Sequence, residues 1–381
     1  MHIAFLTPEY PHPKIKNTAG LGTSIKNLAI ALVKNYHKVT VFVYSQTNNE
    51  VFTDEGVEIH TIAFKKYPVL SWYLYRKEIE KYINDTIQKN SIQVIEAPDW
   101  TGITALMKFQ VPLVIRLHGS DTYFCHLENR KQKLKNFYFE KIALKSADKL
   151  VAVSKFTAHL TKELFNLKNE IKVIYNGIDV NKFIADSGTY EKDTLLYFGS
   201  MIRKKGLLEL AGIFNEVVKQ KPQVKLKLIG KDVVDSLENE STSQLFFKLL
   251  SEQAKKQVEY IPEVPYNEIK LHIAKASVVV LPSFAEAFPM TWLEAMAMGK
   301  ALVTSNIGWA NELMINGETG FMEDPKNHKE YASKILKLLN DSELNSKFGK
   351  SAKKRIYEKF SQKVIVKKNI DYFAKIINEK P

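Results

Sequence analysis

Two glutamates eight positions apart, Glu286 and Glu294, are the residues of this chain best suited to chemistry. The apolar run 276–281 before them predicts a buried parallel strand, and Pro289 and Gly299 suit the start and the end of a helix. The pattern therefore predicts a loop that holds Glu286 and a buried helix that holds Glu294. A buried carboxylate needs a partner. Two carboxylates at a strand's carboxyl end, beside helix N–H groups, favour a ligand with hydroxyls and a phosphate.

A glycine-rich loop follows the first predicted strand. Gly20 and Gly22 would let the backbone approach a ligand closely, and Ser24 suits the first position before a helix. The N–H groups at that helix start would face an anion. A glycine-rich turn without a ligand is an interpretation that stays open. A dinucleotide-binding fingerprint is disfavoured, because the third glycine is missing and the pair comes too late after the strand.

Two further polar residues come at the ends of predicted strands. His118 follows the run 113–117, and an imidazole can donate a hydrogen bond where negative charge grows. Asp99 follows the run 94–97, where its carboxylate would hold the hydroxyls of an acceptor. A simple turn aspartate explains Asp99 equally well.

A basic segment follows the first strand predicted in the second half of the chain. Its residues Gly199, Arg203 and Lys205 lead into a predicted helix. A guanidinium fork or an ammonium at the start of a helix suits a phosphate. An ordinary solvated turn is the alternative.

These residues depend on two sets of alternating strands and helices. Strands are predicted in the first half at 2–7, 39–44, 59–64, 94–97, 113–117, 150–153 and 171–174, with helices such as 24–34 and 71–89 between them. A polar break at 186–193 predicts a linker. The alternation then restarts, with strands at 194–198, 225–229, 258–260, 278–281 and 301–304, and helices at 207–219 and 268–275. Such alternation predicts doubly wound parallel sheets.

Length and composition limit the classes of protein to consider. A chain of 381 residues with 45% apolar and 25% charged residues fits two soluble domains. The single cysteine, Cys125, excludes an intrachain disulfide and a cysteine metal cluster. The first residues do not resemble a signal peptide, and no apolar run approaches a membrane span, so we expect a cytoplasmic protein.

The net charge of +13 favours anionic partners, although solubility alone also explains scattered lysines. The segment 124–149 mixes basic and aromatic residues. It would suit peripheral contact with an acidic membrane at its inner face, or it is an ordinary solvated helix. No motif for nucleic-acid binding occurs, so we expect no nucleic-acid partner.

The stretch from Glu286 to Glu294, followed by Ala-Met-Ala-Met-Gly, resembles the Glu-x7-Glu signature of the family 4 retaining glycosyltransferases. The resemblance implies the GT-B fold, in which two Rossmann-like doubly wound α/β domains flank an inter-domain cleft. Residues 1–185 would form the acceptor-binding domain, with a C-terminal helix, 361–381, packing back on it. Residues 186–360 would form the domain that binds the nucleotide-sugar donor.

The resemblance also implies roles for the site residues. Glu286 would contact the donor sugar, Glu294 the ribose hydroxyls, and His118 the sugar near the reaction centre. The family places an arginine where this chain has Ser200, and Arg203 is the nearest replacement. The implied catalytic residues are His118, Glu286, Arg203 and Lys205. The implied donor-binding residues are Gly20, Gly22, Gly199, Arg203, Lys205, Glu286, Ala287, Phe288, Met290 and Glu294, with Asp99 for the acceptor.

The expected function is therefore transfer of a hexosyl-type sugar, with retention, from a nucleotide sugar to a glycan or lipid-linked acceptor. A UDP-sugar is the first choice of donor, and cell-surface polysaccharide synthesis is the expected setting. No metal-ligand spacing is present, so we expect a metal-independent reaction and no cofactor, the nucleotide sugar being a substrate. A nucleotide-sugar epimerase on the same fold is the alternative. A basic nucleic-acid-binding protein is a third, which leaves the strand-end clusters unexplained.

Overall fold

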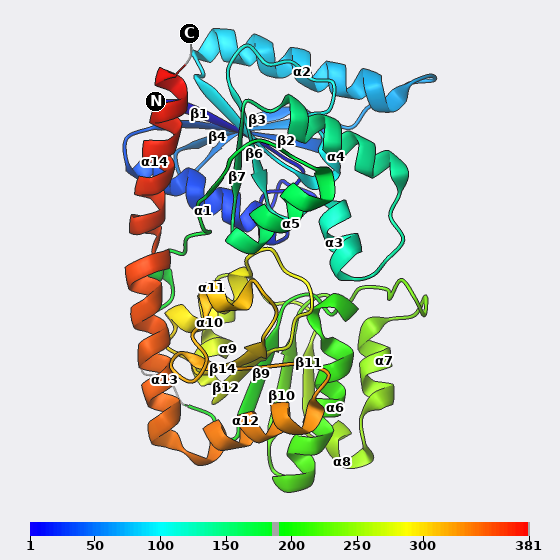
Figure 1. The fold of residues 1–381 in the computed structure, drawn as a ribbon, viewed down its shortest axis with the longest axis vertical. Helices are drawn as coiled ribbons and strands as arrows, with labels where there is room; N and C mark the ends of the chain where they lie inside the picture. The colour runs from blue at the N-terminus through cyan, green and yellow to red at the C-terminus, as the bar shows by residue number, and fades with distance from the viewer. Residues whose placement is uncertain (185–189, 380–381) are drawn as a thin grey trace. The chain divides into compact units, whose positions relative to one another are not determined.

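A computed structural model describes residues 1–184 and 190–379 (Figure 1). The chain divides into two compact units, which are described separately. Unit 1 comprises Met1–Gly177 and the residues from Ser361 onward, and unit 2 is Ile178–Phe360. The boundary predicted between residues 185 and 186 and part of the predicted linker, 186–189, lie outside the described residues.

Unit 1 is built on an eight-stranded sheet in the order β3-β4-β2-β1-β5-β6-β7-β8. Its neighbouring strands are parallel except for β3, which pairs antiparallel with β4 at the edge. The strands are β1 (His2–Thr7), β2 (Lys38–Gln46), β3 (Glu50–Asp54), β4 (Val57–Ala63), β5 (Val94–Pro98), β6 (Leu113–Leu117), β7 (Lys149–Ala152) and β8 (Ile171–Val173).

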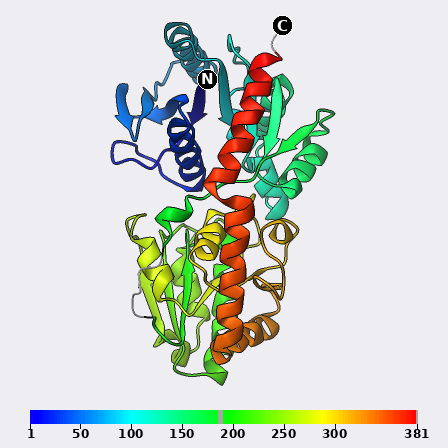
Figure 2. The same cartoon turned by 90° about the vertical axis from the view of Figure 1, so that its left-hand side faces the viewer.

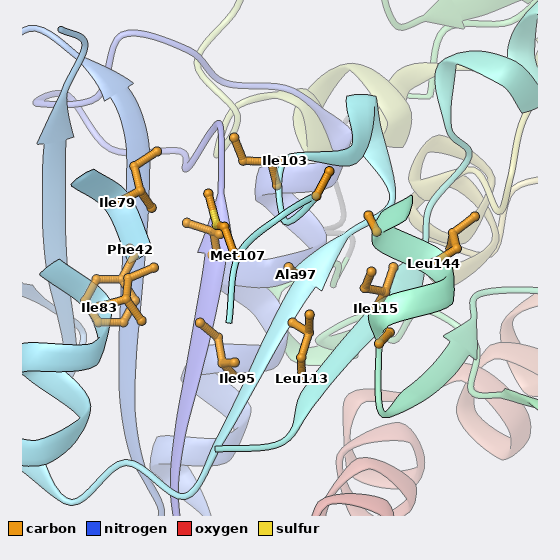
Figure 3. Packing of buried hydrophobic residues seen from close by; sticks show 14 of the residues in the cluster. Phe42, Ile79, Ile83, Ile95, Ala97, Ile103, Met107, Leu113, Ile115 and Leu144 are labelled. Carbon is orange, nitrogen blue, oxygen red and sulfur yellow. The ribbon is translucent and has the colours of Figure 1, made fainter. Parts of the chain in front are cut away.

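Helices cover both faces of this sheet. They are α1 (Gly20–Lys34), α2 (Ser71–Asn90), the 3₁₀ turn η1 (Trp100–Gly102), α3 (Asp121–Leu127), α4 (Leu134–Ser146), α5 (Lys155–Phe165) and α14 (Gln362–Asn378). One apolar cluster packs α2, α4 and α5 on the sheet, and Figure 3 shows part of it, including Phe42, Ile83 and Ile115. The other packs α1 and α14 on the opposite face. Each such buried side chain contributes about 1.5–3 kcal/mol to the free energy of unfolding.

The C-terminal helix α14 belongs to unit 1, where Figure 2 shows it along the sheet. The ring of Phe373 meets Phe5 of β1 at 6.4 Å between ring centroids. Val366 and Phe373, which are spaced at the helical period, are buried, and Ile370 and Ile377 pack against the same cluster. One apolar face of α14 therefore packs on the sheet of unit 1.

Unit 2 has a six-stranded parallel sheet in the order β11-β10-β9-β12-β13-β14. Its strands are β9 (Thr194–Phe198), β10 (Lys225–Ile229), β11 (Val258–Ile261), β12 (Val278–Leu281), β13 (Leu302–Ser305) and β14 (Gly320–Glu323). Its helices are η2 (Val180–Lys182), η3 (Arg203–Lys205), α6 (Leu207–Gln220), α7 (Thr242–Leu249), α8 (Glu252–Lys255), α9 (Ile269–Lys275), α10 (Met290–Ala297), α11 (Ala310–Leu313), α12 (His328–Asn340), α13 (Ser342–Arg355) and the π-helix η4 (Ile356–Phe360).

The two sheets confirm the predicted Rossmann-like α/β alternation. Every strand predicted from the sequence is present, with ends that differ by at most a few residues. The strands β3 and β14 were not predicted from the sequence, and the antiparallel β3 makes the first sheet mixed instead of fully parallel.

Candidate functional site

In each sheet the order of the strands reverses at one point, so that successive strands lie on one side of this point and later strands on the other. In unit 2 the chain runs outward from β9 to β11 on one side and from β12 to β14 on the other. The switch point therefore lies between β9 and β12, which are parallel and end at the same edge. Ligands of open α/β sheets bind outside the carboxyl ends of such strands. The loops that follow β9 and β12 carry Lys205 and Glu286.

Two glycines shape the loop after β9. Gly206 has a φ of +71°, and a Cβ there would lie 1.9 Å from the carbonyl oxygen of Pro282, so only glycine fits. Gly199 has a φ of +132°. The carbonyl of Lys204 accepts a hydrogen bond from the N–H of Phe284 at 2.8 Å, which joins the two loops. Both loops are thus fixed against each other by their backbones.

Lys205 and Glu286 meet at this junction. The Lys205 Nζ lies 3.2 Å from Glu286 Oε1, and both side chains are largely buried. The hydroxyl of Ser283 donates to the same oxygen at 3.3 Å. The structure therefore brings together a cation and a carboxylate that the sequence analysis had placed in separate segments.

Glu294 lies inside α10, as predicted, and is only 4% exposed. The hydroxyl of Tyr266 donates to Glu294 Oε1 at 2.8 Å. Burial raises the pKa of Glu294 to about 7, against the effects of the Tyr266 hydrogen bond and the Lys205 charge. A carboxyl poised near neutrality can gain or lose its proton when a ligand arrives.

The N-terminus of α10 presents backbone N–H groups beside these carboxylates. Pro289 occupies the position before the helix, and Gly299, with a φ of +68°, follows its end. Ala287, Phe288 and Met290 are all buried. A helix leaves its first N–H groups without an intrahelical acceptor, so this end favours an anion.

Arg203 makes an interaction that the sequence did not predict. Its guanidinium forms a two-pronged ion pair with Asp235, with Nε–Oδ2 at 2.7 Å and the second nitrogen–oxygen contact at 3.0 Å. Asp235 is 2% exposed, and this hydrogen bond to Arg203 is the main reason its pKa is lowered. Asp235 also accepts the N–H groups of Leu237 and Glu238. Arg203 is thus tied to the loop after β10, and its replacement of the arginine missing at Ser200 stays a prediction.

The switch point of unit 1 lies between β1 and β5. The helix after β1 begins at Gly20 instead of at Ser24, so the predicted capping role of Ser24 is wrong. Glu9 explains the earlier start, because its Oε1 accepts the N–H of Gly22 at 2.7 Å. Burial raises the pKa of Glu9, while hydrogen bonds from Gly22 and Leu21 oppose the rise. The N–H groups predicted to face an anion are therefore already bound by a carboxyl group of the chain itself.

His118 and Asp99 come together at the neighbouring strand ends. The backbone N–H of His118 donates to Asp99 Oδ1 at 2.9 Å. Burial, with the Arg116 charge adding to it, lowers the pKa of His118 to about 3, so the imidazole is neutral at pH 7. Asp99 is 1% exposed, and burial raises its pKa to about 8. The direct contact of Asp99 with an acceptor stays a prediction.

Strands β5 and β6 also carry a buried charged cluster that was not predicted from the sequence. Arg116 pairs with both oxygens of Glu96 at 2.7 and 2.8 Å, and donates to Asn369 Oδ1 of α14 at 2.6 Å. The two charged side chains are 4% and 3% exposed. A charged residue inside each of two apolar strands was the available signal, because buried charges occur in pairs.

The part of the chain that the structure describes lacks two other features. Residues 1–184 and 190–379 contain no group of three or more His, Cys, Asp or Glu side chains placed to hold a metal ion. Within the same residues, none of the helices combines the length and the apolar character that crossing a bilayer requires.

Two family models match the sequence and together span most of it. The model described as Glycosyltransferase Family 4 matches residues 18–182, and the one described as Glycosyl transferases group 1 matches residues 179–355. An uncharacterized glycosyltransferase of Methanocaldococcus jannaschii is 27% identical over 365 residues, which cover 93% of each chain. The capsular polysaccharide biosynthesis glycosyltransferase CapM of Staphylococcus aureus is 31% identical over 250 residues, 60% of this chain and 62% of CapM.

Solved structures share the fold at low sequence identity. Sucrose-phosphate synthase from Thermosynechococcus elongatus has a TM-score of 0.84 and 18% identity, with 100% of both chains covered. HepE of Anabaena, solved in complex with UDP and glucose, has a TM-score of 0.74 and 19% identity, with 98% of this chain and 100% of HepE covered.

Proposed function

The chain belongs to the family 4 glycosyltransferases, which have the GT-B fold, and from that membership we propose that it transfers a hexosyl residue from a UDP-sugar to a hydroxyl of a glycan or lipid-linked acceptor. The observation that carries the proposal is the group of Lys205, Glu286 and Glu294 at the switch point of unit 2. This group combines one cation with two carboxylates, which suits a ligand with both a diphosphate and hydroxyls.

The proposed donor contacts follow from the chemistry of these side chains. Glu294 accepts hydrogen bonds from the ribose hydroxyls once it is ionised, and the backbone of Ala287 and Phe288 runs beside the sugar. Lys205 leaves Glu286 to bind the diphosphate, supported by the N–H groups at the start of α10. Glu286 then turns its carboxylate to a sugar hydroxyl. Met290 and Gly199 border the same loops and let the donor approach closely.

In the transfer step, the bond between the anomeric carbon and the diphosphate oxygen breaks, and its electron pair stays on the diphosphate. The acceptor oxygen forms the new bond to the same carbon, and its proton passes to the departing phosphate. Lys205 stabilises the charge on the leaving group, and neutral His118 donates a hydrogen bond near the reaction centre. Retention of configuration is part of the proposal because family 4 is a retaining family.

The donor and acceptor classes rest on relatives. HepE binds UDP and glucose, which supports a UDP-sugar, and CapM acts in capsular polysaccharide biosynthesis, which supports a cell-surface glycan. We place the reaction in the cytoplasm, where a chain with a single, unpaired cysteine is expected.

We also propose that the reaction needs no metal ion, because Lys205 and the helix N–H groups supply the positive charge at the diphosphate. Turnover should be unchanged by excess EDTA. Loss of turnover in EDTA that Mg²⁺ or Mn²⁺ restores would contradict this part of the proposal. A known metal-dependent glycosyltransferase in the same assay confirms that the chelator is effective.

The function is tested with a panel of nucleotide sugars, each incubated with and without added glycan acceptors. We expect slow hydrolysis of one UDP-sugar, and release of UDP that becomes faster with the correct acceptor. Conversion of the donor to an epimer without any acceptor would instead identify an epimerase. The double variant Lys205→Ala/Glu294→Ala is the matched blank, and equal activity in it would contradict the proposed site.

A further inference from the structure

Unit 1 exposes large apolar side chains where α2 and α4 begin. Leu134 is 72% exposed and Tyr138 is 58% exposed on α4, while Val69 and Leu70, which precede α2, are 70% and 60% exposed. Burying such side chains is favourable, and their clustering at one place indicates a binding surface. We call these four residues, together with Ile142, the apolar ridge.

The helix period aligns the α4 members of the ridge. Leu134, Tyr138 and Ile142 are spaced four residues apart, so they follow one face of the helix, and Ile142 is still 38% exposed. The opposite face of α4 is the one that packs into the unit, through Ala143 and Leu144. The α4 face is therefore an apolar stripe with no covering element among the described residues.

Ring contacts show that the beginnings of α2 and α4 lie side by side. Trp72 and Phe139 meet at 5.0 Å between ring centroids, and Lys135 Nζ lies 5.9 Å from the Trp72 ring. The Arg76 guanidinium lies 4.4 Å from the centre of the Phe139 ring. Figure 1 shows both helices starting at the same side of unit 1. The apolar ridge is thus built from two segments that are distant in sequence and whose helices pack together.

Lysines surround the ridge. Lys131, Lys133 and Lys135 are exposed at the start of α4, and Lys66 is exposed before α2. Lys141 and Lys145 lie at the angular position of Leu134 on α4. The buried Glu140 faces inward and accepts the N–H groups of Asp121 and Thr122. The charged side chains on the outward face of α4 are therefore all lysines.

We propose that this surface docks unit 1 on a lipid bilayer that contains anionic lipids. Apolar side chains among exposed lysines match the two parts of such a membrane surface, because apolar groups enter the headgroup region while ammonium groups meet anionic headgroups. A protein partner would need complementary apolar area and acidic groups. The same lysines repel a second copy of the chain, which disfavours self-association through this face. The inference does not depend on the proposed reaction, because docking is measured without substrates.

The test is co-sedimentation of the full chain with vesicles of phosphatidylcholine, with and without phosphatidylglycerol. We expect binding only to the phosphatidylglycerol vesicles, and weaker binding as salt is raised. The double variant K131Q/K133Q should lose about tenfold or more in affinity. Its control, K367Q/K368Q, removes two exposed lysines from α14 and should bind as the wild type does.

A second pair of variants separates the apolar part of the surface from its charge. L134S/Y138S should weaken vesicle binding at every salt concentration. Y36S/V51S, which also removes one exposed tyrosine and one exposed aliphatic residue, should not. Circular dichroism confirms that each variant is folded.

Two results would overturn the proposal: a wild type that stays in the supernatant with phosphatidylglycerol vesicles at low salt, or ridge variants that bind as their controls do. Sedimentation velocity gives the rival outcome. A dimer that L134S/Y138S dissociates, without vesicle binding by the wild type, would assign the ridge to a second copy of the chain.

Discussion

At the switch point of unit 2, the ammonium group of Lys205 lies 3.2 Å from the carboxylate of Glu286, and the carboxyl group of Glu294 lies in the helix that follows, α10. In unit 1, the groups at the corresponding edge are a neutral imidazole and a carboxyl whose pKa is raised to about 8. The N-terminus of α1 is also occupied there, by Glu9. The two units share a plan of parallel strands and differ in the charge placed at its functional edge.

This difference in charge between the two units bears on which substrate each unit would bind. A diphosphate needs cations or helix N–H groups, and unit 2 places both Lys205 and the start of α10 at its switch point. In unit 1, Glu9 occupies the N–H of Gly22 and presents a carboxyl to any incoming anion. We therefore propose that unit 1 receives the hydroxyls of the acceptor, the role that the family resemblance implies for it.

Removing the cation of unit 2 should have the largest effect. We expect Lys205→Ala to lower kcat by about 10²–10³, the scale of losing one preorganised transition-state donor. Affinity for the nucleoside part should change far less, because Lys205 contacts neither base nor ribose in the proposed complex. Steady-state kinetics with the preferred donor measures the first effect and calorimetry with uridine the second.

The control for this experiment is Lys219→Ala, which removes an exposed lysine from the last turn of α6. It should keep full activity. A Lys205→Ala enzyme within threefold of the wild type would assign the leaving-group charge to the helix N–H groups alone.

Glu294 should dominate donor affinity. Each charge-assisted hydrogen bond is worth about 1.5–3 kcal/mol, so Glu294→Gln should weaken UDP-sugar binding roughly 10- to 100-fold at pH 8. Because the pKa of Glu294 is raised to about 7, the unbound carboxyl is mostly protonated at pH 6. Wild-type affinity should therefore rise about tenfold between pH 6 and pH 8. Calorimetry at both pH values measures the rise, and Glu294→Gln should show none.

A pH dependence equal in the wild type and in Glu294→Gln would place the titrating group elsewhere. Tyr266→Phe is the matched variant, because it removes the hydrogen bond to Glu294 while keeping the ring. That bond favours the ionised form, so its loss should raise the pKa of Glu294 further and move the rise in affinity to higher pH.

Most of the fold was predictable because the core strands are visible in the sequence as runs of apolar residues. β1, β6, β9, β10 and β12 match their predicted bounds residue for residue. β3 was missed because it is an edge strand whose side chains are mostly exposed, so it lacks an apolar run. β14 begins with a glycine and has only four residues, which gives little pattern to detect.

The site was predictable only where its parts are local. The spacing from Glu286 to Glu294 lies within one strand–loop–helix segment, and its geometry was predicted correctly. The pairing of Arg203 with Asp235 joins residues 32 positions apart, and nothing near Asp235 marks it as buried. The capping of α1 by Glu9 was hidden in the same way, because a loop of ten residues separates the acid from the helix it caps. Tertiary contacts, and not propensity, decide these features.

Variants of Arg203 test whether its guanidinium group contributes positive charge to the switch point of unit 2. We expect Arg203→Ala to lower kcat about tenfold, less than Lys205→Ala, because the guanidinium mainly holds the loop through Asp235. If Arg203 acts only through that pair, the double variant Arg203→Ala/Asp235→Ala should be no worse than either single variant. Kinetics and thermal unfolding of the three variants test this.

If Arg203→Ala instead lowers kcat by about 10² and Asp235→Ala is nearly wild type, the guanidinium contacts the diphosphate directly. That result would restore the role expected from the arginine missing at Ser200. Arg203→Lys discriminates further, because a lysine keeps the charge without the two-pronged geometry.

The smallest effects on turnover are expected from a change of Asp99, the protonated carboxyl group at the strand ends of unit 1. Its folded-state pKa of about 8 lies above its ordinary value of 3.8, so the folded protein binds this proton more tightly than the unfolded chain. The stability that the proton provides is present at low pH and declines as pH rises from about 4 to about 8, by up to about 1.4 kcal/mol per pH unit. Asp99→Asn removes this decline, so the melting temperature of the variant should gain on the wild type as pH rises through that window. Because Asp99 is the residue predicted to hold the acceptor hydroxyls, the variant should raise the acceptor KM, and because Asn keeps an oxygen that can accept the backbone N–H of His118, it should lower kcat less than tenfold. An unchanged acceptor KM would show instead that Asp99 only orders the backbone at His118 and does not contact the acceptor.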